Sequence, residues 1–107
     1  MSGGSSSDYD WPGTPDDNCD IVLRTPLNST DERVLEKLKV GDILEIRLVI
    51  ESGRKVVAAV RAELGVAGVV TSIQAAILFK CLEKGVTYIA EITKLDSPSC
   101  QVEVRRN

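Results

Sequence analysis

The stretch that decides the fold is DILEIRLVI at residues 42–50, which is followed by KVVAAVRA at residues 55–62. In the first run every second residue is apolar, the period of a half-buried strand. These apolar residues, expected to point inward, are Leu44, Ile46, Leu48 and Ile50. The two runs are joined by a short loop that contains Gly53, a pattern that predicts an antiparallel β-hairpin.

Further elements are expected on both sides of this hairpin. Ser29, followed three residues later by Glu32, has the spacing of a capping box and predicts a short helix. A longer helix is expected at about residues 72–84, because Gly85 suits a helix C-terminus. Its inward face is expected to include Ile73, Ala76, Ile77, Leu78 and Cys81. Further strands are expected at residues 19–25, 65–70, 86–95 and 100–106.

This order of elements predicts one α+β domain at residues 19–107. Short antiparallel strands with one helix inserted late favour a small, partly open antiparallel β-barrel of the SH3 or OB kind. A β-grasp arrangement has the same order of hairpin, helix and strand, and it is the alternative. Residues 1–18 are rich in Gly, Ser, Asp and Pro, a composition typical of a disordered tail.

The charge is divided unevenly along the chain. Five of the 16 acidic residues lie within the first twenty positions, whereas all 13 Lys and Arg residues follow them, so the predicted domain is slightly basic. Within the acidic segment DYDWPGTPDD, Tyr9 and Trp11 lie between aspartates and prolines. Aromatic side chains of this kind dominate protein interfaces. Tyr9 and Trp11 are therefore predicted to contact a protein partner.

A second candidate site consists of basic residues on and beside the predicted hairpin. All of these residues are expected on an outer face or in a turn, where their side chains could contact phosphates. These residues are Lys39, Arg47, Arg54, Lys55 and Arg61. Glutamates are interleaved with them, and the predicted domain contains few aromatic residues on which bases could stack. Nucleic-acid binding is therefore the alternative to protein binding.

The composition argues against catalysis and against a bound cofactor. The chain contains no histidine, which removes the usual general base and the imidazole metal ligand. Cys19, Cys81 and Cys100 form no CxxC pair, so no metal site is predicted. Unpaired thiols suit a reducing compartment, although a Cys19–Cys100 bridge between the first and last strands is conceivable. With no catalytic constellation and no histidine, the chain is predicted not to be an enzyme. With no visible leader and no membrane span, it is predicted to be cytoplasmic.

The rhythm of residues 38–93 resembles that of the HIRAN domain, a small barrel whose members grip DNA ends. The resemblance is carried by LKVGDILEIRL, KVVAAV and AGVVTSIQAAILFKCLEKGVTYIAEI. It implies a barrel with a helix before a strand of the Y-x-A-x-I type. The family's N-x-x-D-x-x-A segment is missing between residues 51 and 55, so no functional residue is carried over. The overall expectation is a small binding module with an acidic docking tail, and DNA-end or single-strand binding is the alternative.

Overall fold

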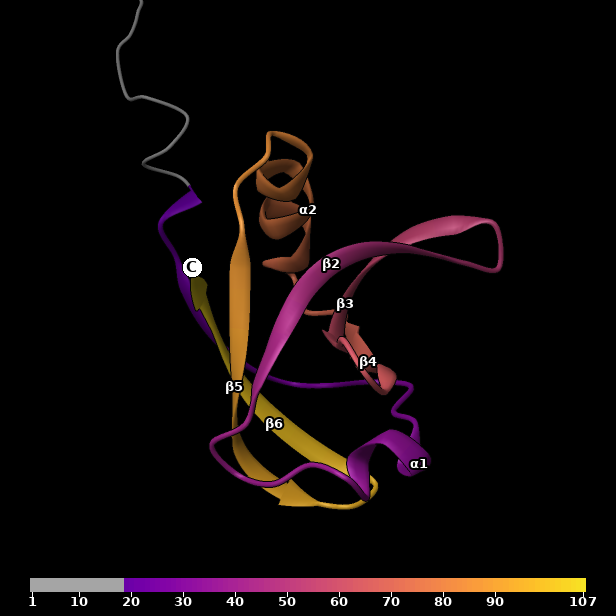
Figure 1. Ribbon diagram of the computed structural model, residues 1–107. Helices are drawn as coiled ribbons and strands as arrows, with labels where there is room; N and C mark the ends of the chain where they lie inside the picture. The colour runs from indigo at the N-terminus through magenta and orange to yellow at the C-terminus, as the bar shows by residue number, and fades with distance from the viewer. Residues whose placement is uncertain (1–18) are drawn as a thin grey trace, which may run out of the picture.

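The structure, a computed structural model, describes residues 19–107. The predicted tail at residues 1–18, with Tyr9 and Trp11, lies outside this part of the chain. Six strands and two short helices follow one another in the predicted order (Figure 1). They are β1 (Val22–Pro26), α1 (Glu32–Leu35), β2 (Ile43–Glu51), β3 (Arg54–Arg61), β4 (Gly65–Val70), α2 (Ala75–Glu83), β5 (Tyr88–Asp96) and β6 (Ser99–Arg106). Across residues 19–107, no helix is long and apolar enough to cross a membrane.

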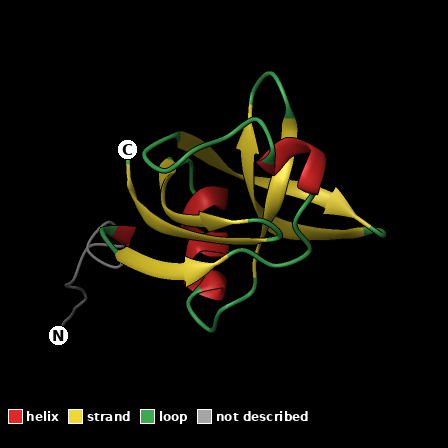
Figure 2. Cartoon of the chain, turned by 90° about the horizontal axis from the view of Figure 1, so that it is seen from below, coloured by secondary structure: helices red, strands yellow, loops and turns green. Residues whose placement is uncertain are grey.

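The six strands form one antiparallel sheet in the order β1-β6-β5-β2-β3-β4. The strands wrap around the interior of the molecule, as Figure 2 shows. No ladder closes the sheet among the described residues, but Asn28 and Val69 form a single bridge between its two edges. In this bridge each amide donates to the other residue's carbonyl over 2.8 Å. The predicted α+β class is therefore confirmed, with a curled sheet that stays open.

Alternating side chains of the strands form the core. The inward residues of β2, β5 and β6 are nearly inaccessible to solvent, as their period-two pattern predicts. They are Leu44, Ile46, Tyr88, Ala90, Ile92, Cys100, Val102 and Val104. The Tyr88 hydroxyl donates a hydrogen bond to the Cys19 carbonyl, which attaches the start of the described chain to β5.

The end of the β2–β3 hairpin extends beyond the sheet (Figure 1). β2 pairs with β5 only from Ile43 to Ile46, whereas it pairs with β3 as far as Glu51. Ile50 is consequently 68% exposed, and the expectation that it points into the core is wrong. Its place in the alternating pattern is regular, but no other element covers that part of the hairpin.

Helix α2 is shorter than predicted, because it begins at Ala75 rather than at residue 72. Ile73 therefore lies in the preceding turn and is 95% exposed, so its predicted inward position is wrong. Ala76 and Ile77 are also exposed, and of the predicted inward face only Leu78 and Cys81 are buried. The predicted end is confirmed. Gly85 has a positive φ of 94°, and the Val86 amide donates to the Cys81 carbonyl, as in a Schellman motif.

The short helix α1 begins at a different cap from the predicted one. The Asp31 side chain accepts a hydrogen bond from the Arg33 amide over 2.9 Å, so Asp31 is the N-cap. Ser29 instead has a positive φ of 49° and lies two residues before the cap. The capping box predicted from Ser29 and Glu32 is therefore wrong, because the chain turns sharply before the helix begins.

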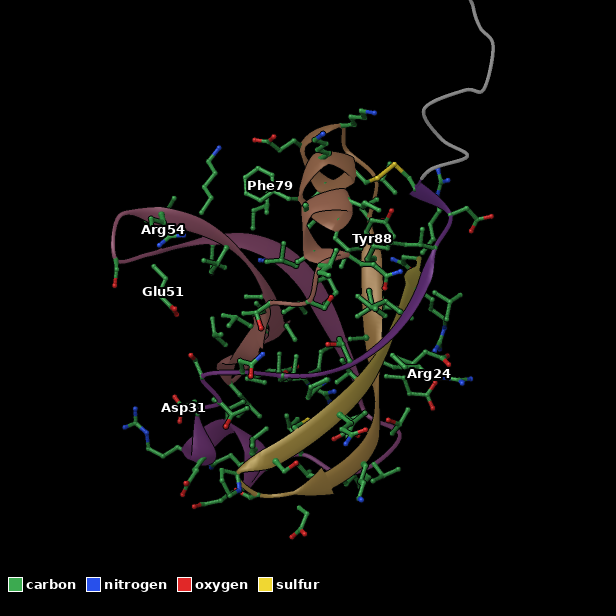
Figure 3. All side chains as sticks on the ribbon, turned by 180° about the vertical axis from the view of Figure 1, so that it is seen from behind. Arg24, Asp31, Glu51, Arg54, Phe79 and Tyr88 are labelled. Atoms are coloured by element: carbon green, nitrogen blue, oxygen red, sulfur yellow. A yellow bond between two sulfur atoms is a disulfide. The ribbon has the colours of Figure 1, made fainter. Side chains whose placement is uncertain are left out.

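Two of the three cysteines form a disulfide, which corrects the prediction of unpaired thiols. Cys19 is bonded to Cys81 on α2, while Cys100 is buried and free. Figure 3 shows the sulfur–sulfur bond between α2 and the start of the described chain. The Cys19–Cys100 bridge considered from the sequence is excluded by this pairing. Cys81 is buried as expected, but as half of a disulfide, and the argument from free thiols to a reducing compartment no longer applies.

Candidate functional site

An apolar groove lies between helix α2 and the adjoining parts of strands β3 and β4. Its cavity volume is about 410 Å³. The apolar lining comes from three elements and consists of Val56, Val57, Val69, Val70, Ala75, Ala76 and Phe79. Phe79 projects from α2 toward the β2–β3 hairpin (Figure 3). The groove can therefore receive apolar side chains from outside the domain.

The groove exists because β4 stops at Val70, opposite Val57, whereas the antiparallel strand β3 extends beyond this pair to Arg54. The last pair between these strands is Val57 with Val70, and the chain then turns away through Thr71 toward α2. Within the described residues, no strand pairs with Lys55 or Val56 on this side of β3. One wall of the groove is thus a short stretch of unpaired strand edge, and the opposite wall is a helix.

The hairpin turn determines which backbone groups of β3 face the groove. Ser52 and Gly53 both have positive φ, of 53° and 78°, as a two-residue type I′ turn requires. In such a hairpin Glu51 and Arg54 bond to each other, and the direction of the backbone groups alternates from there. The amide and carbonyl of Lys55 therefore point away from β2, toward the groove side. They are available to pair with an added extended chain.

Two lysines give the rim of the groove a positive charge. Lys55 and Lys80 both line it, from β3 and α2 respectively. Lys55 Nζ lies 3.7 Å from Glu83 Oε2, and both side chains are about half exposed. In the part of the chain that the structure describes, Lys80 forms no ion pair. The rim can therefore attract carboxylates next to an apolar side chain.

The basic residues predicted to contact phosphates do not gather on one surface. Lys39 pairs with Asp42 over 3.4 Å in the turn before β2, and Arg47 pairs with its neighbour Glu45. These two cations lie beside carboxylates that reduce the local positive potential.

The remaining three candidates belong to β3. Arg61 Nε lies 3.4 Å from Glu63 at one end of the strand, and its guanidinium also donates to the Ile43 carbonyl. Arg54 lies at the other end, beside the hairpin turn, and forms no ion pair among residues 19–107. Of the five predicted residues, only Lys55 lines the groove.

Among residues 19–107, three titratable groups have shifted pKa values, and none of them lines the groove. The Lys39 backbone amide donates to the Asp42 carboxylate and is the largest cause of its lowered pKa. Burial raises the pKa of the Tyr88 hydroxyl and of the Cys100 thiol. Within residues 19–107, no three His, Cys, Asp or Glu side chains lie close enough together to hold a metal ion.

Sequence reasoning missed the groove because its residues had an ordinary explanation. An aromatic residue on an apolar helix, such as Phe79, is ordinarily assigned to the core, whereas Phe79 is only half-buried and packs against the edge of the core. The signal that could have located the groove is the difference in length between the runs KVVAAVRA and GVAGVV. If the shorter run pairs from the connecting turn outward, the far end of the longer one is left without a partner.

Comparison of the chain with protein-family models, curated proteins and solved structures finds no match.

Proposed function

We propose that this chain is a non-catalytic binding module that holds a short, extended segment of a protein partner in the groove between β3 and α2. The observation that carries the proposal is the unpaired edge of β3 at Lys55 beside an apolar lining. A peptide that adds to a strand edge gains main-chain hydrogen bonds, and pockets for its alternate side chains provide specificity.

The rim of the groove defines the chemistry of the preferred segment. An aromatic or aliphatic residue fits against Val56, Ala76 and Phe79, while acidic neighbours can pair with Lys55 and Lys80. Charge complementarity of this kind selects partners and steers association. The preferred ligand is therefore an extended peptide with an apolar anchor between aspartates or glutamates.

The finer fold assignment is part of the same proposal. A small open barrel of the SH3, OB or HIRAN kind is supported by the curled sheet, whose edges meet at Asn28 and Val69. The β-grasp alternative has less support, because its helix would lie across the middle of an open sheet. Helix α2 instead adjoins the hairpin formed by β2 and β3 (Figure 1).

Binding of nucleic acid, the alternative predicted from the sequence, has less support than peptide binding. Four of the five predicted contacts lie next to a carboxylate, and only Lys55 lines the groove. A salt titration with a single-stranded and a blunt-ended oligonucleotide tests it. Binding that is tight at low salt and falls steeply as salt rises would favour this alternative.

The cytoplasmic location expected from the sequence remains part of this proposal. The Cys19–Cys81 pair provides the test, because thiols are kept reduced in that compartment. Rapid alkylation of the protein in intact cells reports whether this pair is reduced or bonded there. Recovery of the protein with this pair oxidised would oppose the cytoplasmic assignment.

The peptide proposal is tested with the Trp11→Ala chain, which contains no tryptophan because Trp11 is the only one. Two synthetic ten-residue peptides are added, each with one tryptophan, flanked by aspartates in one and by lysines in the other. Only the acidic peptide should bind saturably and show a blue-shifted emission. Its affinity should fall about tenfold or more, roughly 1.4 kcal/mol, when Ala76→Asp places a like charge in the groove.

The matched control for this experiment is Ala62→Asp, an exposed position outside the groove. It should leave the affinity for the acidic peptide within about twofold, because it adds the same charge at a distance. Equal binding by the Ala76→Asp and Ala62→Asp chains would exclude the groove as the site. The absence of saturable binding by either peptide would remove the proposed function itself.

A further inference from the structure

The disulfide determines where the N-terminal segment leaves the domain. Cys19 is bonded to Cys81, which is adjacent in sequence to Lys80 on the rim of the groove. Figure 3 shows this bond on one side of α2 and Phe79 on the side toward the hairpin. The segment before Cys19 therefore starts at the helix that forms one wall of the groove.

The segment before Cys19 is long enough to reach the groove. Trp11 precedes Cys19 by eight residues, which span up to about 26 Å when extended. A helix with its side chains is about 10–12 Å across, so the path around α2 is within this reach. No rearrangement of the described elements is needed.

The same segment has the chemistry that the groove prefers. Tyr9 and Trp11 alternate with Asp8 and Asp10, and no Lys or Arg occurs in the first twenty residues. An extended chain with this sequence places its aromatic side chains on one face and its carboxylates on the other. The sequence thus supplies two apolar anchors and two negative charges.

We infer that Asp8–Trp11 binds in the groove of its own chain, where Trp11 packs against Phe79 and the aspartates face Lys55 and Lys80. This inference rests on the proposed function, since it assigns the first occupant of the same groove. The docked segment excludes a partner peptide, which must displace it. The groove is thereby selective for partners that bind better than the chain's own acidic segment.

The size of this effect follows from the short tether. A short flexible linker gives an effective concentration on the order of 1 mM. If the segment binds as a separate peptide with a Kd of about 0.1 mM, roughly nine molecules in ten are self-occupied. Loss of the anchor in Trp11→Ala should then strengthen binding of an added acidic peptide by about tenfold.

The single tryptophan allows a direct measurement on the full chain. Docked Trp11 should show blue-shifted emission and protection from acrylamide quenching, both independent of protein concentration. Ala76→Asp, and Lys55→Glu combined with Lys80→Glu, should restore the emission of an exposed tryptophan. The controls Ala62→Asp and Lys84→Glu lie outside the groove and should leave the emission unchanged.

The chain's own acidic segment should bind more tightly in the groove of Glu83→Gln, because this change releases Lys55 from its carboxylate partner. This variant should increase the protection of Trp11 and leave the apparent affinity for an added acidic peptide nearly unchanged, because the freed Lys55 favours both ligands equally. A misfolded variant would lose both properties together. An unchanged or decreased protection of Trp11 in Glu83→Gln would oppose the inference.

A final comparison separates this inference from the proposed function. The peptide of residues 8–17 is added to the Trp11→Ala chain, and its own tryptophan is monitored. This peptide could bind in the groove while Trp11 of the intact chain is fully exposed. That result would overturn self-occupancy and would still support the proposed peptide binding. Protection of Trp11 that grows with protein concentration would replace self-occupancy by exchange between copies. No binding in either experiment would overturn both.

Discussion

At the residue scale, Asp42 shows how one carboxylate fixes the entry into the central strand. Its side chain accepts the Lys39 amide over 3.0 Å, and its carbonyl accepts the Ile92 amide from β5 over 3.0 Å. The hydrogen bond from the Lys39 backbone amide is the largest cause of the lowered pKa of Asp42, and the Lys39 side chain lowers this pKa further. The ionised carboxylate is therefore favoured by the folded state.

The sign of the resulting pH dependence follows from this lowered pKa. Near its ordinary pKa of 3.8 the Asp42 carboxyl binds more protons in the unfolded chain than in the folded one. Its contribution to stability is therefore present above that value and is lost as the pH falls through the folded pKa. In thermal unfolding, Asp42→Asn should have a lower Tm than the unsubstituted chain near neutral pH, and the difference should shrink toward about pH 3.

The control for the pH experiment is Glu36→Gln, which removes an exposed carboxylate. Among the described residues this side chain makes no ion pair, so the Tm difference between Glu36→Gln and the unsubstituted chain should stay small across the same range. A Tm difference for Asp42→Asn that stays the same at every pH would contradict the assignment, because it would show a loss that does not depend on charge.

At the scale of elements, Gly68 allows the two edges of the sheet to meet. A Cβ at this position would lie 2.9 Å from Leu27 Cβ and 3.0 Å from the Asn28 carbonyl oxygen. Both are parts of the segment that forms the bridge to Val69. Gly68→Ala should therefore lower the free energy of unfolding by roughly 1–3 kcal/mol, because a closely packed backbone must move.

Urea denaturation measures the stability of Gly68→Ala, and amide hydrogen exchange locates the change. The amides of Asn28 and Val69 bond across the bridge, so their exchange should accelerate more than that of the β5–β6 ladder. Uniform acceleration over both regions would indicate a general loss of stability and would contradict a local role for Gly68.

The elements also show how far the sequence could predict this structure. Period-two alternation located the strands, because each inward residue on β5 and β6 loses contact with water. Alternation failed at Ile50 and helical spacing failed at Ile73, because exposure there depends on neighbouring elements and on where the helix begins. The groove was not predicted for the same reason. It depends on where β4 stops relative to β3, which is a relation between two strands.

At the scale of the whole molecule, the Cys19–Cys81 bond links the start of the described chain to α2. The two residues are 62 positions apart, so the bond closes a loop that contains β1, α1, the whole β2–β3 hairpin and β4. The spacing of the cysteines along the chain could not reveal this pairing, because it depends on the chain before β1 lying beside the C-terminal half of α2. The connection is what places the acidic segment next to the groove.

The stability of the domain should depend strongly on this bond. In the chain-entropy view, a closed loop of this length stabilises the folded state by about 4 kcal/mol. That is a large share of the roughly 5–15 kcal/mol by which a domain is stable. Urea unfolding with and without reductant should therefore give clearly different midpoints, and Cys19→Ser should behave like the reduced chain in both conditions.

Thiol labelling identifies the bonded pair independently of stability. With no reductant, the native chain should label at none of its three cysteines, because Cys100 is buried and the other two are bonded. In denaturant one thiol should label, and Cys100→Ala should remove it. Reductant added to the denatured chain should expose all three. Labelling of three thiols in denaturant alone would show that Cys19 and Cys81 are unbonded, and the route from the domain to the groove proposed for the acidic segment would then lose its fixed starting point.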